Sequence, residues 1–71
     1  MRLASTLIRL SQVHGQTIPF TKREISELIG ATLETTFRAL KDFQKKGFVS
    51  SGRGTIHIKN LQELRDFADK I

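Results

Sequence analysis

The 71-residue sequence contains no cysteine, tryptophan or tyrosine, and only one proline. Without cysteine the chain can form neither a disulfide nor a zinc finger, and it has no thiol nucleophile. Its apolar runs are only a few residues long, far below the ~18 needed to cross a membrane, and its N-terminus lacks the charged-then-apolar layout of a signal peptide. We therefore expect a cytoplasmic protein that does not associate with membranes.

The length predicts a single domain, 1–71, near the lower size at which a hydrophobic core alone can stabilise a fold. A large buried cleft is not expected. The net charge of +5 favours polyanionic partners, although charge alone is a weak indication. Residues 60–71 carry two basic and three acidic side chains, so the positive charge belongs to the chain before them.

Residues 21–46, TKREISELIGATLETTFRALKDFQKK, predict two helices joined by a tight turn at Gly30. Thr21 and Glu24 have the spacing of a capping box, which starts the first helix. Gly30 ends it because glycine adopts a positive φ without strain. The apolar face expected for this helix consists of Ile25, Leu28 and Ile29.

The remaining segments complete a recognisable layout. Residues 2–13 place leucines at helical spacing, and residues 17–20 predict a short edge strand because proline cannot donate to a ladder. Residues 48–58 predict a two-stranded hairpin, or wing, with a turn at 51–54, and residues 61–70 predict a last helix. This order predicts a winged helix-turn-helix, mainly α, with about four helices, a two-stranded wing and a short edge strand.

The second helix of the helix-turn-helix, 33–46, has two chemically opposite faces on a helical wheel. Its inward face holds Thr36, Ala39, Leu40 and Phe43, and its outward face holds Glu34, Phe37, Arg38 and Lys41. The inward Thr36 hydroxyl needs a partner, and we expect it to donate to the carbonyl one turn back. We interpret this threonine as structural.

Arg38 and Glu34 are the best candidates for base contacts. A guanidinium can bond both major-groove acceptors of guanine, and a carboxylate can accept from the amino group of cytosine. Spacing alone is equally compatible with an i,i+4 salt bridge worth a few tenths of a kcal/mol. The helix-turn-helix context favours base contact.

Candidates for phosphate contacts lie at helix starts, on the outward face and at the wing tip. They are Thr21, Lys22, Thr32, Lys41 and Arg53. Thr21, Thr32 and Arg53 are the strongest, because helix N-termini and glycine-flanked tips approach the DNA backbone closely. Exposed charged residues are otherwise usually just solvated.

From Leu3 to Phe67 the chain resembles the C-terminal DNA-binding domain of the Crp/Fnr family of bacterial transcription regulators. The motif is TKREISELIG-x-T-x-ET-xx-R-x-L-xx-F-xx-KG, followed by GRGTI-x-I. The resemblance implies sequence-specific binding of double-stranded DNA, with helix 33–46 in the major groove. Members that read a TGA-type core use residues matching Glu34 and Arg38.

The resemblance also implies what lies outside the chain. Such regulators carry an upstream sensor domain and a dimerisation helix, which this sequence lacks, so we expect it to be a fragment that dimerises only through the missing region. RNA polymerase is a candidate partner.

Two outward positions depart from the family pattern. Leu33 stands where some members place a second guanine-reading arginine, and Phe37 stands where glycine or serine is usual. The Phe37 ring either touches a thymine methyl group or packs against Leu33 or a partner chain. We include both residues among the base contacts.

A winged helix can also serve as a protein-interaction or scaffold module, and here Leu33 and Phe37 would be its apolar patch. Catalysis is not expected, because His14 and His57 are far apart without a carboxylate at ligand spacing. Residues 52–55 lack the lysine and the following helix of a phosphate loop. We expect no catalytic residue, metal or cofactor.

Overall fold

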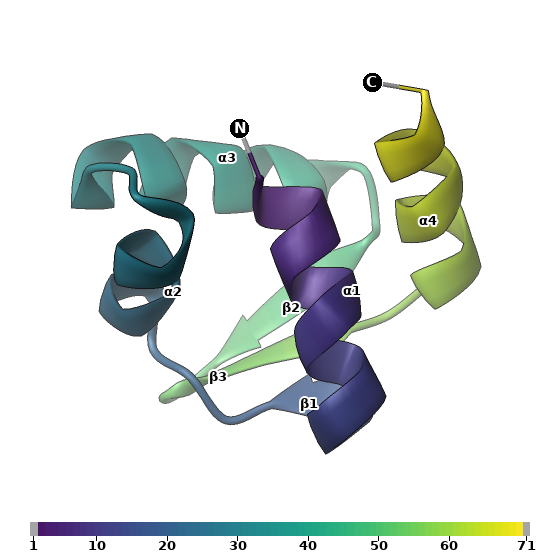
Figure 1. Ribbon diagram of the computed structural model, residues 1–71, viewed down its shortest axis with the longest axis horizontal. Helices are drawn as coiled ribbons and strands as arrows, with labels where there is room; N and C mark the ends of the chain where they lie inside the picture. The colour runs from purple at the N-terminus through teal and green to yellow at the C-terminus, as the bar shows by residue number, and fades with distance from the viewer. Residues whose placement is uncertain (1, 71) are drawn as a thin grey trace.

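The computed structural model describes residues 2–70. Within them the chain forms four helices and three short strands (Figure 1). In chain order these are α1 (Leu3–His14), β1 (Thr17–Ile18), α2 (Lys22–Ile29), α3 (Leu33–Lys45), β2 (Val49–Gly52), β3 (Thr55–Ile58) and α4 (Leu61–Asp69). The predicted fold class is confirmed, with helix ends that differ from the predictions by about one residue.

The three strands form an antiparallel sheet in the order β1-β3-β2. The short strand β1 lies at one edge, where Ile18 pairs with Ile56 of β3. Pro19 follows β1 immediately and cannot donate to a ladder, so the strand stops there. The predicted edge strand is therefore confirmed, and β3 is the central strand.

The wing, formed by β2, β3 and their turn, has a tighter tip than the sequence predicts. The expected turn covered residues 51–54, but Gly52 still pairs with Thr55. Only Arg53 and Gly54 remain unpaired between the strands. Gly54 has a φ of 71°, a left-handed conformation that glycine adopts without strain, and it lets the two strands reverse over two residues.

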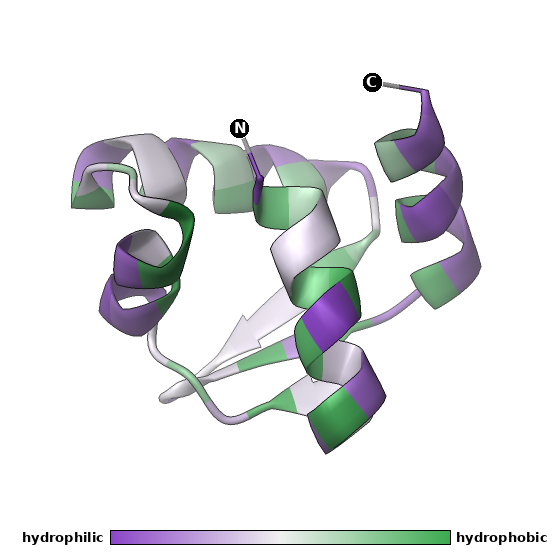
Figure 2. Ribbon diagram, viewed as in Figure 1, coloured by the Kyte–Doolittle hydropathy of each residue, from purple (hydrophilic) through white to green (hydrophobic). Residues whose placement is uncertain are grey.

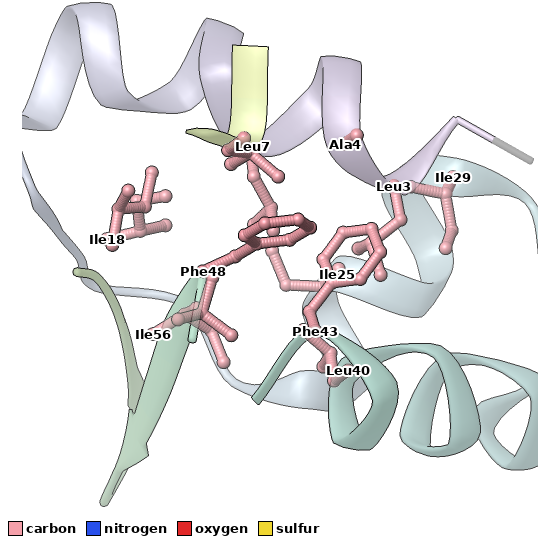
Figure 3. Close-up of a cluster of buried hydrophobic side chains, with 13 residues drawn as sticks. Leu3, Ala4, Leu7, Ile18, Ile25, Ile29, Leu40, Phe43, Phe48 and Ile56 are labelled. Carbon is pink, nitrogen blue, oxygen red and sulfur yellow. The ribbon is translucent and has the colours of Figure 1, made fainter. Parts of the chain in front are cut away.

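The hydrophobic core lies between the helices and the inner face of the sheet (Figure 3). Every helix and strand contributes to it. Its most deeply buried members include Leu3, Leu7, Ile18, Ile25, Leu40, Val49, Ile56, Ile58 and Leu64. Along α4 the hydrophobic residues lie mainly on the side of the helix toward α1 and the hydrophilic residues on the opposite side (Figure 2), and Leu64 of this helix is buried.

One predicted core position is wrong. Leu28 of α2 is 52% exposed, and Ser26 is buried in its place. On a helix of about 100° per residue, Ser26 lies on the other side of Ile25 and Ile29 from Leu28. The small serine allows a close approach of the neighbouring elements, and its hydroxyl is satisfied by the Arg23 carbonyl at 2.6 Å.

A tight turn at Gly30 joins α2 to α3. Gly30 adopts the left-handed conformation, with φ 69° and ψ 29°, as predicted. The Ala31 amide donates to the Ser26 carbonyl at 3.1 Å and so satisfies the end of α2. Thr32 then caps α3 by accepting from the Thr35 amide at 3.1 Å.

Candidate nucleic-acid interface

The two faces of α3 are as the sequence predicts. Thr36, Leu40 and Phe43 are buried, whereas the outward face of Glu34, Phe37, Arg38 and Lys41 is exposed. Core packing therefore explains the inward residues and leaves the outward face available to a partner.

Glu34 and Arg38 form an ion pair across one turn of α3, with Nη2 of Arg38 3.0 Å from Oε1 of Glu34. The side chains of Arg38 and Glu34 are 80% and 82% exposed. An ion pair at this exposure adds little to stability. The guanidinium has five donors, so this contact leaves several of them for another acceptor.

Phe37 lies beside Lys22, which begins α2. The Lys22 ammonium is 5.2 Å from the centroid of the Phe37 ring, within the range of a cation–π interaction. The ring is nevertheless 48% exposed. A predicted phosphate contact and a predicted base contact, on different helices, are therefore neighbours in space.

The hydroxyls of the two helix-capping threonines, Thr21 and Thr32, differ in the hydrogen bonds that they make. Thr21 accepts from the Glu24 amide at 3.1 Å, while the Glu24 carboxylate accepts from the Thr21 amide at 2.8 Å, which confirms the capping box. Thr32 accepts from the Thr35 amide and also donates its proton to the Thr35 hydroxyl at 2.9 Å. The Thr32 hydroxyl therefore acts as both a hydrogen-bond acceptor and a donor. The Thr21 hydroxyl acts only as an acceptor in the capping box, so its proton is available to a further acceptor.

A groove of about 320 Å³ joins the start of α2, the start of α3 and the wing tip. Its lining consists of Thr21, Lys22, Arg23, Leu33, Phe37, Gly52, Gly54 and Thr55. Four of the predicted contact residues therefore share one hollow, and Arg53 lies between two of its glycines. Arg23 is an additional basic residue that the sequence did not single out.

Other predicted residues lie around this groove. Lys41 lines an adjoining hollow with Lys22 and Phe37. Arg38 lies toward the other edge of α3, where it borders an apolar groove between α1, α3 and α4. The outward face thus has a Phe37 edge facing the wing and an Arg38 edge facing away from it.

A link between α3 and the wing was missed by the sequence. The Gln44 amide donates to the Ser51 hydroxyl of β2. Gln44 follows Phe37 by two helical turns and lines the same hollow as Lys41, and this spacing is the signal that could have placed it on this edge.

Three further observations concern metal ions, the two histidines and membranes. Within residues 2–70, no group of three or more His, Asp or Glu side chains is arranged to hold a metal ion. The His57 ring is hydrogen-bonded to the Thr17 hydroxyl, which lies on the neighbouring strand β1. The His14 ring packs against the Phe20 ring. Over the same residues, no helix is long and apolar enough to cross a membrane.

A helix-turn-helix followed by a hairpin wing, with an exposed polar face on the second helix and basic residues around it, defines a winged helix-turn-helix DNA-binding domain. The family model of the Crp-like helix-turn-helix domain matches residues 1–67. The chain belongs to this family, which consists of DNA-binding domains of transcription regulators and is not an enzyme family.

Solved structures agree with this assignment. The catabolite activator protein of Thermus thermophilus is 27% identical, with a TM-score of 0.88 over 97% of this chain. A transcriptional regulator of the CRP/FNR family, also from Thermus thermophilus, is 25% identical, with a TM-score of 0.86 over 96% of this chain. FixK2 from Bradyrhizobium japonicum is 28% identical, with a TM-score of 0.75 over 92% of this chain.

The chain spans 33%, 39% and 35% of the length of these three proteins, respectively. A search of curated protein sequences gave no match.

Proposed function

We propose that this domain reads a specific DNA sequence by placing α3 in the major groove. The observation that carries the proposal is the outward face, where Glu34, Phe37, Arg38 and Lys41 are exposed while the opposite face of the same helix is buried. Arg38 would bond guanine and Glu34 would accept from cytosine, either on one base pair or on adjacent pairs. Opening their 3.0 Å ion pair costs little because both side chains are already solvated.

Leu33 and Phe37 supply the apolar part of the readout. The Lys22 ammonium lies over the Phe37 ring, and the 48% exposure of Phe37 leaves surface available to a thymine methyl group. Leu33 lines the same groove and would extend the apolar surface toward the wing.

Phosphate contacts come from Thr21, Lys22, Thr32, Lys41 and Arg53, and they position α3 without reading sequence. Thr21 is the stronger of the two threonines, because its proton is not used by the capping box. Thr32 would have to release its hydrogen bond to Thr35. Its backbone position at the start of α3 still favours an anion.

In the cell this domain would act within a longer regulator. Dimerisation through a region outside this chain would place two copies of α3 on two half-sites about one helical turn apart. The Crp/Fnr assignment supports this arrangement, and RNA polymerase is the candidate partner on promoter DNA.

The test is selection of preferred sites from random double-stranded DNA with the 71-residue chain. A shared core among the selected sequences, lost when Arg38→Ala is used, is the expected result. Selected pools that remain random, although the wild-type chain binds duplex DNA, would contradict sequence-specific reading. The chain offers one copy of α3, so the expected core is a half-site.

The half-exposed Phe37 ring favours a second candidate, a protein-interaction module whose apolar patch is Leu33 and Phe37. Salt separates the two functions. Several phosphate contacts make DNA binding fall steeply as salt rises, whereas contact through an apolar patch is nearly insensitive to salt. Failure to bind any duplex at low salt would favour the protein-interaction function.

A further inference from the structure

The hydrogen bond between Gln44 and Ser51 joins α3 directly to the wing. Nε2 of Gln44 lies 2.5 Å from Oγ of Ser51, and both residues are exposed. Neither residue is packed in the core, so the contact is not a by-product of core packing.

Strand geometry explains why Ser51 faces α3. Side chains alternate along a strand, so Ser51 points to the same face as Val49, which is 1% exposed. Its cross-strand partner Ile56 is also buried on that face. Ser51 therefore lies on the inner face of the wing, next to buried residues but itself exposed to solvent.

The tip beyond Ser51 has little else to hold it. Strand β1 pairs with β3 only at Ile56 and His57, so the hairpin continues past the edge of the three-stranded sheet. Isolated two-stranded hairpins are marginally stable, and the turn residue Arg53 is flanked by two glycines. The hydrogen bond to Ser51 is therefore placed where few other contacts restrain the angle of the wing tip.

We propose that Gln44 and Ser51 are a positioning pair that holds the wing at a fixed angle to α3, so that Arg53 meets a DNA phosphate while α3 lies in the major groove. The inference rests on the proposed function. Arg53 follows Ser51 by two residues, and Gln44 lies on the Phe37 edge of α3, which faces the wing. The pair couples the two DNA-contacting elements without itself touching DNA.

The first test is a double-mutant cycle for binding of the 71-residue chain to a short random-sequence duplex at low salt. If Gln44 positions Arg53, the Arg53→Ala substitution should cost less affinity in the Gln44→Ala variant than in wild type. The fold-loss of affinity in the variant should be about one third of the fold-loss in wild type. Gln44→Ala should also reduce the dependence of log affinity on log salt toward that of Arg53→Ala. Additive losses, or an unchanged salt dependence, would overturn the proposal.

Matched variants separate positioning from direct contact. Ser51→Ala should reproduce the effect of Gln44→Ala, the two changes together should cost no more than either one, and Ser51→Thr should retain near wild-type affinity because it keeps the hydroxyl. A larger loss for Gln44→Ala than for Ser51→Ala would overturn the positioning role, since Gln44 would then contact DNA itself. Gln62→Ala is the control, because Gln62 makes a similar side-chain hydrogen bond to Asp66 on α4.

A second measurement does not require DNA. Backbone ¹⁵N relaxation of the free chain should show lower order parameters at residues 53–55 in Gln44→Ala than in wild type, with α1 unchanged. Equal order parameters would overturn the proposal even if wild type bound no DNA. Absence of DNA binding by wild type would instead count against the proposed function alone.

Discussion

The Thr36 hydroxyl donates a 2.9 Å hydrogen bond to the carbonyl of Thr32, one turn back along α3, and Thr36 is fully buried. The same carbonyl also accepts from the Thr36 amide at 3.0 Å. The hydroxyl is therefore satisfied by a carbonyl that already has its helical partner. Thr36 serves the packing of α3 and leaves the outward face to other residues.

Thr36→Val should leave the free energy of unfolding within about 1 kcal/mol of wild type. The substitution removes the hydroxyl without leaving the Thr32 carbonyl unpaired, and it adds apolar surface to the core. Thr36→Ala should be less stable than Thr36→Val, because it removes a buried methyl group. Urea unfolding measures both variants. If Thr36→Val were strongly destabilised relative to wild type, the Thr36 hydroxyl would have a further stabilising role.

Arg38→Ala should weaken binding to the selected half-site by about 1–3 kcal/mol and relax the preference at one base pair. The loss should be much smaller on random-sequence duplex, because a base contact carries specificity. Fluorescence anisotropy with both duplexes measures the difference. Arg65→Ala on α4 is the charge-matched control and should affect neither duplex strongly. Equal losses on both would make Arg38 a phosphate contact.

Replacing thymine by deoxyuracil in the selected half-site tests the role of Phe37. Removing the methyl group that Phe37 contacts should cost about 0.8 kcal/mol, or roughly fourfold in affinity. With Phe37→Ala the two duplexes should bind equally. An undiminished penalty in the variant would show that the ring acts only through its contact with Lys22.

Arg53→Ala should weaken binding to all duplexes by a similar factor and reduce the slope of log affinity against log salt by about 1. Phosphates are the same in every sequence, so the preferred site should not change. Lys70→Ala, at the end of α4, is the control for loss of one positive charge. A changed sequence preference would place Arg53 on a base.

Thr21→Ala and Thr32→Ala should each lower the free energy of unfolding by about 1 kcal/mol, because each removes a helix N-cap. Their effects on DNA binding should differ. Thr21 has a proton to donate to a phosphate, whereas the proton of Thr32 is held by Thr35. Thr21→Ala should therefore weaken binding more, as measured at a temperature where both variants are folded. The reverse order would contradict this assignment.

The sequence predicted the relationships that are local along one helix. The capping box of Thr21 and Glu24, the two faces of α3 and the hydrogen bond of Thr36 depend on spacings of three or four residues. Helical geometry fixes which residues at those spacings meet. Spacing also allowed the contact between Glu34 and Arg38, although it could not assign that pair to DNA or to solvent.

Relationships between elements were not predictable in the same way. The contact of Lys22 with Phe37 and that of Gln44 with Ser51 depend on how α2 and the wing dock on α3. The exposure of Leu28 has the same origin, because hydrophobic spacing does not reveal how much of a short helix its neighbours cover. Docking angles are set by side-chain packing across the whole core.

The division of α3 into a buried and an exposed side has a consequence for how such a domain can diverge. The side chains of Arg38 and Glu34 are 80% and 82% exposed, so changes at these two positions can rewrite target preference while the folding free energy stays nearly constant. Phe37 is less independent, because it also contacts Lys22. A designer retargeting this scaffold could vary Glu34 and Arg38 freely, and should vary Phe37 and Lys22 together.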